Sequence, residues 1–190
     1  RNLILENIYY RPVDGNYGLL RKLPYQADAV TAQLEAVLLK EIDIQKYLES
    51  NLIQASELVI QKPIVDLFRD KRYPFDSSAI KPMPQFLMEQ SGIEADLISL
   101  RIRDGRVRYY EFAEKGMVPG MISFNRINVD LAPFYLRKSG QKYPVDQLRV
   151  GMEAYLMDIA KVNLNAMMYF LENHPMDVEV KMESFALNEV

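Results

Sequence analysis

The chain of 190 residues contains no cysteine and a single histidine, and both features exclude chemistry. Without cysteine there is no disulfide, no thiolate metal site and no cysteine nucleophile. One histidine leaves little room for a histidine-based metal site or a catalytic triad. This residue, His174, stands in the run Asn173-His174-Pro175 and is most simply a turn residue. We therefore expect no metal and no cofactor.

Motifs for nucleotide or acyl-transfer chemistry are also missing. There is no phosphate loop, dinucleotide glycine fingerprint, calcium loop, zinc helix motif or nucleophile elbow. Carboxylate pairs such as Glu41 with Asp43, or Glu111 with Glu114, have no histidine beside them, so they are weak candidates for acid–base catalysis. The sequence predicts a protein that is not an enzyme.

The chain has no basic excess and no long apolar run. Its 23 Lys and Arg against 26 Asp and Glu give a net charge of −3, which disfavours nucleic acid as a partner. No apolar run is long enough to span a bilayer, and no signal-peptide pattern is present. The chain begins at Arg1 without Met and ends in a patterned run. We expect residues 1–190 to be a single β-rich segment of a longer protein.

Alternation of apolar and polar residues dominates what is present, and it is clearest at Ile98–Tyr110 (ISLRIRDGRVRYY). A period of two is typical of a half-buried strand. The pair Asp104-Gly105 suits a two-residue type I′ turn, because both central residues of that turn need φ > 0. The pattern therefore predicts a β-hairpin. Its apolar face would carry Ile98, Leu100, Ile102, Val107 and Tyr109.

The other face of this segment carries Arg101, Arg103, Arg106 and Arg108. Four like charges repel if they are left unpaired. We interpret them as a solvated face balanced by carboxylates on neighbouring strands. The alternative is a docking patch for anionic headgroups or an acidic partner.

Further strands are expected along the chain, at Leu3–Tyr10, at Leu52–Phe68, and at Tyr155–Leu171 and Val178–Met182. Because proline cannot donate a ladder hydrogen bond, we expect the chain either to bend at Pro63 or to lie at a sheet edge there. Ile122–Leu131 changes phase, which indicates a β-bulge near Asn125-Arg126. Short helices are expected at Asp43–Ser50, with Asp43 as N-cap, and at Gln85–Ser91. Arg11–Gly18 reads as a bend and Pro133–Asp146 as a polar connection. Ala27–Leu39 fits a strand or a helix equally well.

Ten methionines add a second indication. Methionine fills irregular apolar space in ordinary cores, and this is the simpler interpretation. The alternative is an adaptable apolar surface that holds acyl chains.

Several segments together resemble AsmA-like proteins. The runs AVTAQLEAVLL, EIDIQKYL and LIQASELVIQKPIVDLFRD resemble the repeating unit of that family. ADLISLRIRDGRVRYYE, GMISFNRINVDLAPF and VEVKMESFALNEV resemble its following strands. The resemblance favours a strand at Ala27–Leu39. It also implies a mainly β fold, in which a curved antiparallel sheet forms an elongated trough with one or two short helices.

The resemblance further implies a periplasmic protein that is anchored in the inner membrane by a segment absent from this chain. Such proteins take part in phospholipid transport and outer-membrane biogenesis and integrity, so the expected partner is a phospholipid or another acyl-chain lipid. The competing hypothesis is a β-rich scaffold or adhesion-type domain with a closed core and no ligand. The candidate lipid-lining residues are Ile98, Leu100, Ile102, Val107, Tyr109, Val162, Leu164, Met168, Phe170, Val178, Val180 and Met182.

Overall fold

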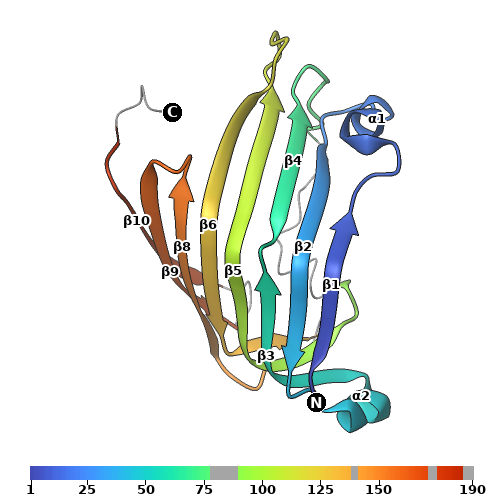
Figure 1. Ribbon diagram of the computed structural model, residues 1–190, viewed down its shortest axis with the longest axis vertical. Helices are drawn as coiled ribbons and strands as arrows, with labels where there is room; N and C mark the ends of the chain where they lie inside the picture. Colours follow the sequence, from blue (N-terminus) through green and yellow to red (C-terminus); the bar gives the residue numbers. More distant parts are fainter. Residues whose placement is uncertain (78–89, 138–140, 171–174, 186–190) are drawn as a thin grey trace.

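The computed structural model describes residues 1–77, 90–137, 141–170 and 175–185. Within these residues the strands form one ten-stranded sheet, accompanied by two short helices (Figure 1). The predicted mainly β fold is confirmed. The elements are β1 (Leu3–Tyr10), α1 (Gly15–Arg21), β2 (Asp28–Lys40), α2 (Ile44–Ser50), β3 (Leu52–Gln61), β4 (Ile64–Asp70), β5 (Glu94–Phe112), β6 (Gly120–Ala132), β7 (Phe134–Leu136), β8 (Gln147–Leu156), β9 (Ala160–Tyr169) and β10 (Met176–Met182).

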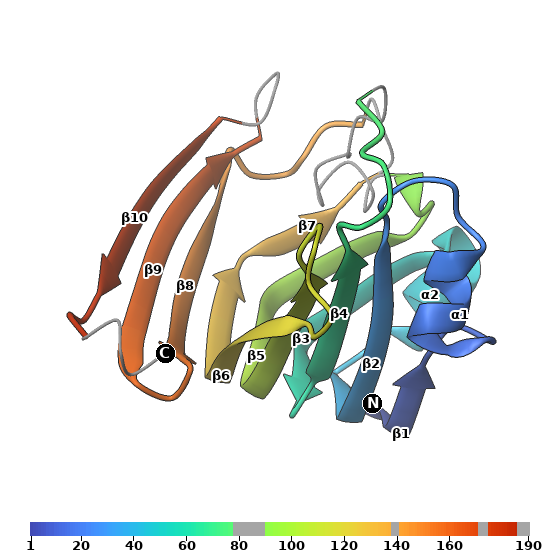
Figure 2. The ribbon, with the colours of Figure 1, turned by 90° about the horizontal axis from the view of Figure 1, so that it is seen from above.

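The strand order is β1-β2-β3-β5-β6-β8-β9-β10, with β4 between β2 and β5 and with β7 beside β5. Neighbouring strands are antiparallel except at β3–β5 and β4–β5, which are parallel. The sheet is therefore mixed, whereas the resemblance implied an antiparallel one. Seen from above, the strands from β1 to β10 follow a curved path (Figure 2).

Several local predictions are confirmed. Ala27–Leu39 is strand, in β2, and Pro63 separates β3 from β4. Asp43 caps α2, because its side chain accepts a hydrogen bond from the backbone N–H of Lys46 at 2.9 Å. The register between β6 and β8 shifts between Asn125 and Asn128, which is the predicted bulge.

The predicted hairpin at Asp104-Gly105 is wrong. β5 runs straight through this pair as one strand of 19 residues. Only Asp104 has a positive φ, of 53°, whereas a type I′ turn needs two such residues. Asp104 instead lies in a bulge, and β6 shifts register on either side of Gly105. A two-residue turn and a one-residue bulge change the phase of the apolar pattern in the same way, so the pattern alone did not separate them.

Three other segments differ from expectation. The bend at Arg11–Gly18 contains the start of α1, which packs through the buried side chain of Leu20. The connection Pro133–Asp146 contains β7, which pairs with the start of β5. The segment Tyr155–Leu171, which was expected to be one strand, is divided by a turn at Met157-Asp158, where both residues have a positive φ. β8 ends before this turn and β9 begins after it. Residues 85–89 of the expected helix at Gln85–Ser91, and the expected turn at His174, lie outside the residues that the structure describes.

Candidate functional site

Apolar residues of neighbouring strands lie directly opposite one another across the whole sheet. Because directly opposed residues point to the same face, each such row belongs to one face. Two rows cross eight strands without a polar residue, and we call the face that carries them the apolar face. The first row is Leu3, Leu39, Leu58, Leu100, Leu131, Val150, Ala166 and Val178, and the second is Leu5, Val37, Ile60, Ile102, Val129, Met152, Leu164 and Val180.

A line of left-handed residues crosses the sheet beside these rows, and we call it the crease. Asn7, Lys62, Asp104 and Arg126 have φ between 42° and 54°, and they lie on β1, between β3 and β4, on β5 and on β6. Their positions match across strands, since the backbone N–H of Lys62 donates to the carbonyl of Arg103. Asp104 and Arg126 are bulge positions, where the register with a neighbouring strand changes and the side-chain alternation shifts by one.

The crease keeps apolar residues on one face although their sequence phase changes. A Cβ on Gly105 would lie 3.4 Å from the side chains of Ile102 and Ile127, so Gly105 faces the same side as Ile102. Val107, two residues further, then faces that side too. The apolar face therefore continues beyond the crease. The next complete row there is Tyr10, Ala32, Val65, Val107, Phe124, Leu156 and Ala160.

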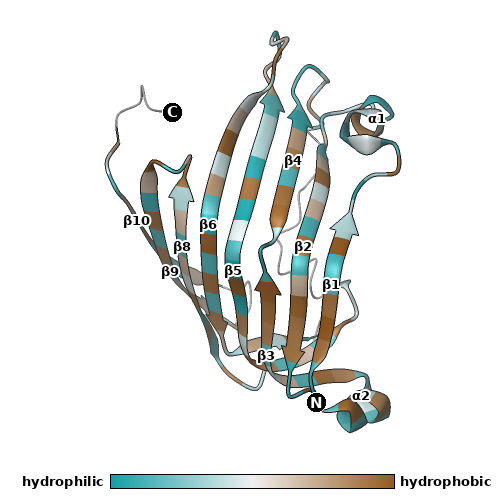
Figure 3. Cartoon of the chain, viewed as in Figure 1, coloured by the Kyte–Doolittle hydropathy of each residue, from teal (hydrophilic) through white to brown (hydrophobic). Residues whose placement is uncertain are grey.

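The opposite side, which we call the polar face, is held together by ion pairs. Glu57 pairs with Lys40 at 2.6 Å and with Arg101 at 2.8 Å. The hydrogen bond from Lys40, aided by Arg101, lowers the pKa of Glu57. An apolar patch of Ile4, Leu38 and Val59 interrupts this face near the β1 edge. Figure 3 shows the resulting hydrophobic band over β1, β2 and β3.

Three of the four arginines of β5 pair with carboxylates on neighbouring strands. Arg103 pairs with Asp130 of β6, and Arg108 pairs with Asp66 of β4 at 2.6 Å. Arg101 pairs with Glu57 and also lies 3.3 Å from Asp130. Among the described residues Arg106 forms no ion pair. The interpretation as a balanced polar face is thus confirmed for Arg101, Arg103 and Arg108.

Most of the predicted lining residues lie together on the apolar face. The rows contain Leu100, Ile102 and Val107 of β5, Leu164 of β9, and Val178 and Val180 of β10. Tyr109 pairs with Leu67 and Ile122 in the next row. On the same face of β9 and β10, Val162 pairs with Met182, and Met168 pairs with Met176.

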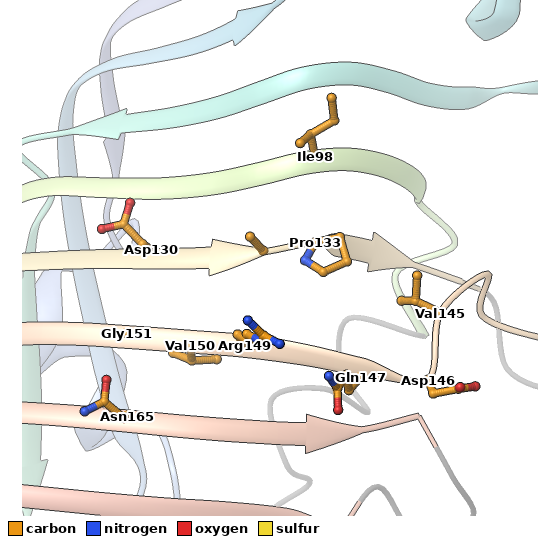
Figure 4. A pocket seen from close by; sticks show the side chains of 11 residues that line it. Ile98, Asp130, Pro133, Val145, Asp146, Gln147, Arg149, Val150, Gly151 and Asn165 are labelled. Atoms are coloured by element: carbon orange, nitrogen blue, oxygen red, sulfur yellow. The ribbon is translucent and has the colours of Figure 1, made fainter.

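Ile98 and Phe170 do not join this group. Ile98 is 71% exposed and lines a groove of about 1000 Å³ beside Asp130, Arg149 and Asn165, which belong to the polar face (Figure 4). The cause is a further phase change in β5, because Leu97 already packs with Leu100 in one apolar cluster. Phe170 lies just beyond β9, where its ring stacks on Tyr143 with centroids 4.0 Å apart.

Sequence reasoning missed the contribution of β8 to the apolar face. Leu148, Val150, Met152, Ala154 and Leu156 occupy every second position of β8, so the signal was present between the supposed polar connection, which ends at Asp146, and the expected strand, which begins at Tyr155. It also missed the apolar cluster at the start of β5. Its buried members are Leu39, Ala55, Ala95, Leu97, Phe134 and Leu136.

The apolar face has no packed layer over it among the described residues. No large side chain there is completely buried. α1 lies on the polar face, where Tyr17 contacts Phe68 edge-on at 5.8 Å and Asn16 donates to Thr31. α2 buries none of its own residues. The first two rows are therefore partly buried in mid-sheet, apart from Leu39, which is buried in a cluster with Leu97 and Phe134, and they are exposed at both edges.

A charged row closes the apolar face at one end of the strands. Asp28, Arg69 and Glu111 lie opposite one another on β2, β4 and β5. Lys71 pairs with Glu111 at 2.8 Å, and the hydroxyl of Tyr109 donates to Glu111 at 2.6 Å. Desolvation and this hydrogen bond raise the pKa of Tyr109 to about 12. The apolar surface consequently extends across the strands, from β1 towards β10, and on β2, β4 and β5 it ends at this charged row.

No protein-family model matches the chain, and no curated protein matches it. Within the described residues, no group of histidine and carboxylate side chains could hold a metal ion. None of the described helices has the length and apolar character needed to cross a bilayer.

Proposed function

We propose that this chain is a non-enzymatic lipid-binding or lipid-conducting segment, and that acyl chains lie against its apolar face. The observation that carries the proposal is the pair of apolar rows that cross eight strands. An apolar surface of this extent is unusual in a protein without a partner for it. Acyl chains would remove it from water without needing any side-chain chemistry, which agrees with the lack of catalytic motifs.

The shape of the apolar face also favours an extended apolar ligand. Charged residues such as Arg69 and Glu111 close the face at one end of β4 and β5. Across the strands it stays apolar as far as Leu3 and Val178, which are 47% and 48% exposed. A path of this form suits acyl chains that enter or leave at the sheet edges. A compact cofactor would instead favour an enclosed pocket.

The resemblance to AsmA-like proteins leads to a narrower form of the proposal. In this narrower proposal the ligand is a phospholipid, and the segment belongs to a longer protein that is anchored in the inner membrane. The segment would lie in the periplasm and contribute to phospholipid transport and outer-membrane integrity. The architecture of the chain, a single curved sheet with few helices, supports this narrower proposal.

The competing scaffold with a closed core needs a second layer to bury the apolar face. The described residues contain a single sheet, and each of their ten strands belongs to it, so no second layer of strands is present among them. In that hypothesis Ile60, Ile102 and Val129, which lie in the centre of a row, would be sealed from water. They are instead only partly buried.

Because the chain has no cysteine, single cysteines can report which face meets lipid. Ile60 lies on the apolar face, and its neighbour Gln61 lies opposite Arg103 on the polar face. We expect a fluorophore on Ile60→Cys to be quenched by phospholipid that carries a nitroxide on its acyl chain. The same fluorophore on Gln61→Cys should be quenched much less. Equal quenching at the two positions, or none at either, would contradict the proposal.

A further inference from the structure

Four loops leave the sheet at one end of its strands, and we call them the upper loops (Figure 1). They are residues 11–14 after β1, residues 22–27 before β2, residues 71–77 after β4 and residues 113–119 between β5 and β6. The charged row of Asp28, Arg69 and Glu111 marks the same end on β2, β4 and β5. α2 lies at the opposite end, between the end of β2 and the start of β3.

Each of the upper loops exposes a large apolar side chain. Val13, Phe75, Met117 and Val118 are between 67% and 101% exposed, and Tyr25 is also exposed. Apolar residues that are scattered singly over a surface need no explanation, but these five share one end of the molecule. Their concentration indicates a surface that contacts an apolar environment.

Two of the upper loops are joined by hydrogen bonds. The backbone N–H of Gln26 donates to the carbonyl of Pro74 at 2.9 Å, and its side-chain amide donates to the carbonyl of Tyr73 at 2.9 Å. These bonds lie next to Tyr25 and Phe75 in the sequence. The two exposed rings are therefore presented by a backbone that is held in place.

The charge of the upper loops differs from that of the chain. They contain five Lys or Arg and three Asp or Glu, whereas the whole chain has a net charge of −3. Three of the five cations form ion pairs, and these are Lys22, Lys71 and Arg72, with Asp14, Glu111 and Asp70 as partners. Among the described residues Arg11 and Lys115 form no ion pair, and both are exposed. Anionic headgroups attract such Lys and Arg side chains to a bilayer surface.

The opposite end of the sheet also exposes an apolar side chain, but its charge does not suit such a surface. Leu48 of α2 is 78% exposed. Residues 41–51, which contain α2, carry one lysine against three Asp or Glu. Their negative charge opposes contact with an anionic bilayer. Apolar exposure and positive charge thus coincide at the upper loops.

We propose that the upper loops dock on the surface of an anionic lipid bilayer and insert their apolar tips into its interfacial layer. The inserted side chains are Val13, Phe75, Met117 and Val118. They lie on separate loops, and a fluid bilayer accepts separate tips, whereas a protein partner would need a pocket for each anchor. The strands then run away from the bilayer. This docking does not depend on what lies against the apolar face.

Tryptophan reports the insertion directly, since the chain has none of its own. We expect the fluorescence of Met117→Trp to shift to the blue on phosphatidylcholine–phosphatidylglycerol vesicles, and to be quenched when their acyl chains carry bromine. Leu48→Trp is the matched control, because Leu48 is as exposed as Val118, at 78%, but lies on α2 at the opposite end. Equal quenching of the two variants, or quenching of neither, would overturn the proposal.

Substitutions of exposed residues separate the apolar and the charged contributions. Val118→Asp should weaken binding to these vesicles in co-sedimentation by about tenfold or more, because it removes an inserted side chain. Lys115→Glu should weaken binding by about 5- to 30-fold, whereas Lys46→Glu on α2 should leave it unchanged. On vesicles of phosphatidylcholine alone, Lys115→Glu should have little effect. All three residues are exposed, so the fold persists in each variant. A chain that sediments with neither kind of vesicle, or that binds regardless of Val118→Asp and Lys115→Glu, would refute the docking.

Discussion

Replacing Ile102 by glutamate places a charge in the middle of the apolar face. Ile102 lies between Ile60 of β3 and Val129 of β6 and is only partly buried. Loss of its buried apolar area should cost about 1–2 kcal/mol of folding free energy. The new carboxylate stays partly hydrated on an open face, so the larger penalty for a buried, unpaired charge does not apply. Domains with 5–15 kcal/mol of stability tolerate this loss.

The same change should remove bound lipid, because a charge interrupts the path between the edges of the sheet. Gln61→Glu is the matched control: it adds the same charge one strand away, on the polar face and opposite Arg103. We expect its stability to change by less than about 0.5 kcal/mol and its lipid content to be unchanged. The assays are chemical denaturation and the amount of phospholipid per chain. Unfolding of Ile102→Glu would indicate a sealed core, and a folded variant with its normal lipid would exclude Ile102 from the lining.

Three further predictions concern the stability of the fold. Gly105→Val should lower the melting temperature, because even a Cβ there would lie 3.2 Å from the Pro63 ring, and Gly105→Ala should lower it less. Asp43→Ala should cost about 0.5–2 kcal/mol, measured by denaturant unfolding, since it removes the cap of α2; Asp43→Asn should retain most of the stability. The lowered pKa of Glu57 means that its charge stabilises the fold above the ordinary carboxyl pKa, and that this gain is lost as pH falls through the lowered pKa. Glu57→Gln should therefore flatten the acid limb of the stability–pH curve, and an unchanged limb would show that the pairs with Lys40 and Arg101 contribute nothing.

Much of the strand content could be predicted because side-chain alternation is local. β10 and the bulge in β6 each carry their pattern within about ten residues, whereas the pattern of β2 fitted a strand or a helix equally well and only the resemblance favoured a strand. The same locality explains the failure at Asp104-Gly105. Whether the chain turns back or continues there depends on β3 and β4, which lie 42 positions earlier and pair with β5 on both sides of the bulge. Parallel pairing of this kind leaves no local signature.

The candidate surface was predicted in part, for a related reason. Leu100, Ile102 and Val107 were correctly placed on one face although the predicted turn between them was wrong, because a turn and a bulge shift phase alike. Ile98 was misplaced, since a second phase change separates it from Leu100 and no turn signal marks it. Residues of β8 were missed because most of the strand lies between the expected connection, which ends at Asp146, and the expected strand, which begins at Tyr155. The crease itself emerges only when the registers of several strands are compared.

Native mass spectrometry of the purified chain tests the central claim most directly. The proposed function predicts phospholipid mass on the intact chain, and loss of that mass in Ile102→Glu but not in Gln61→Glu. A clean apo mass for the unmodified chain, obtained under conditions that preserve lipid on a known lipid-binding protein, would contradict it.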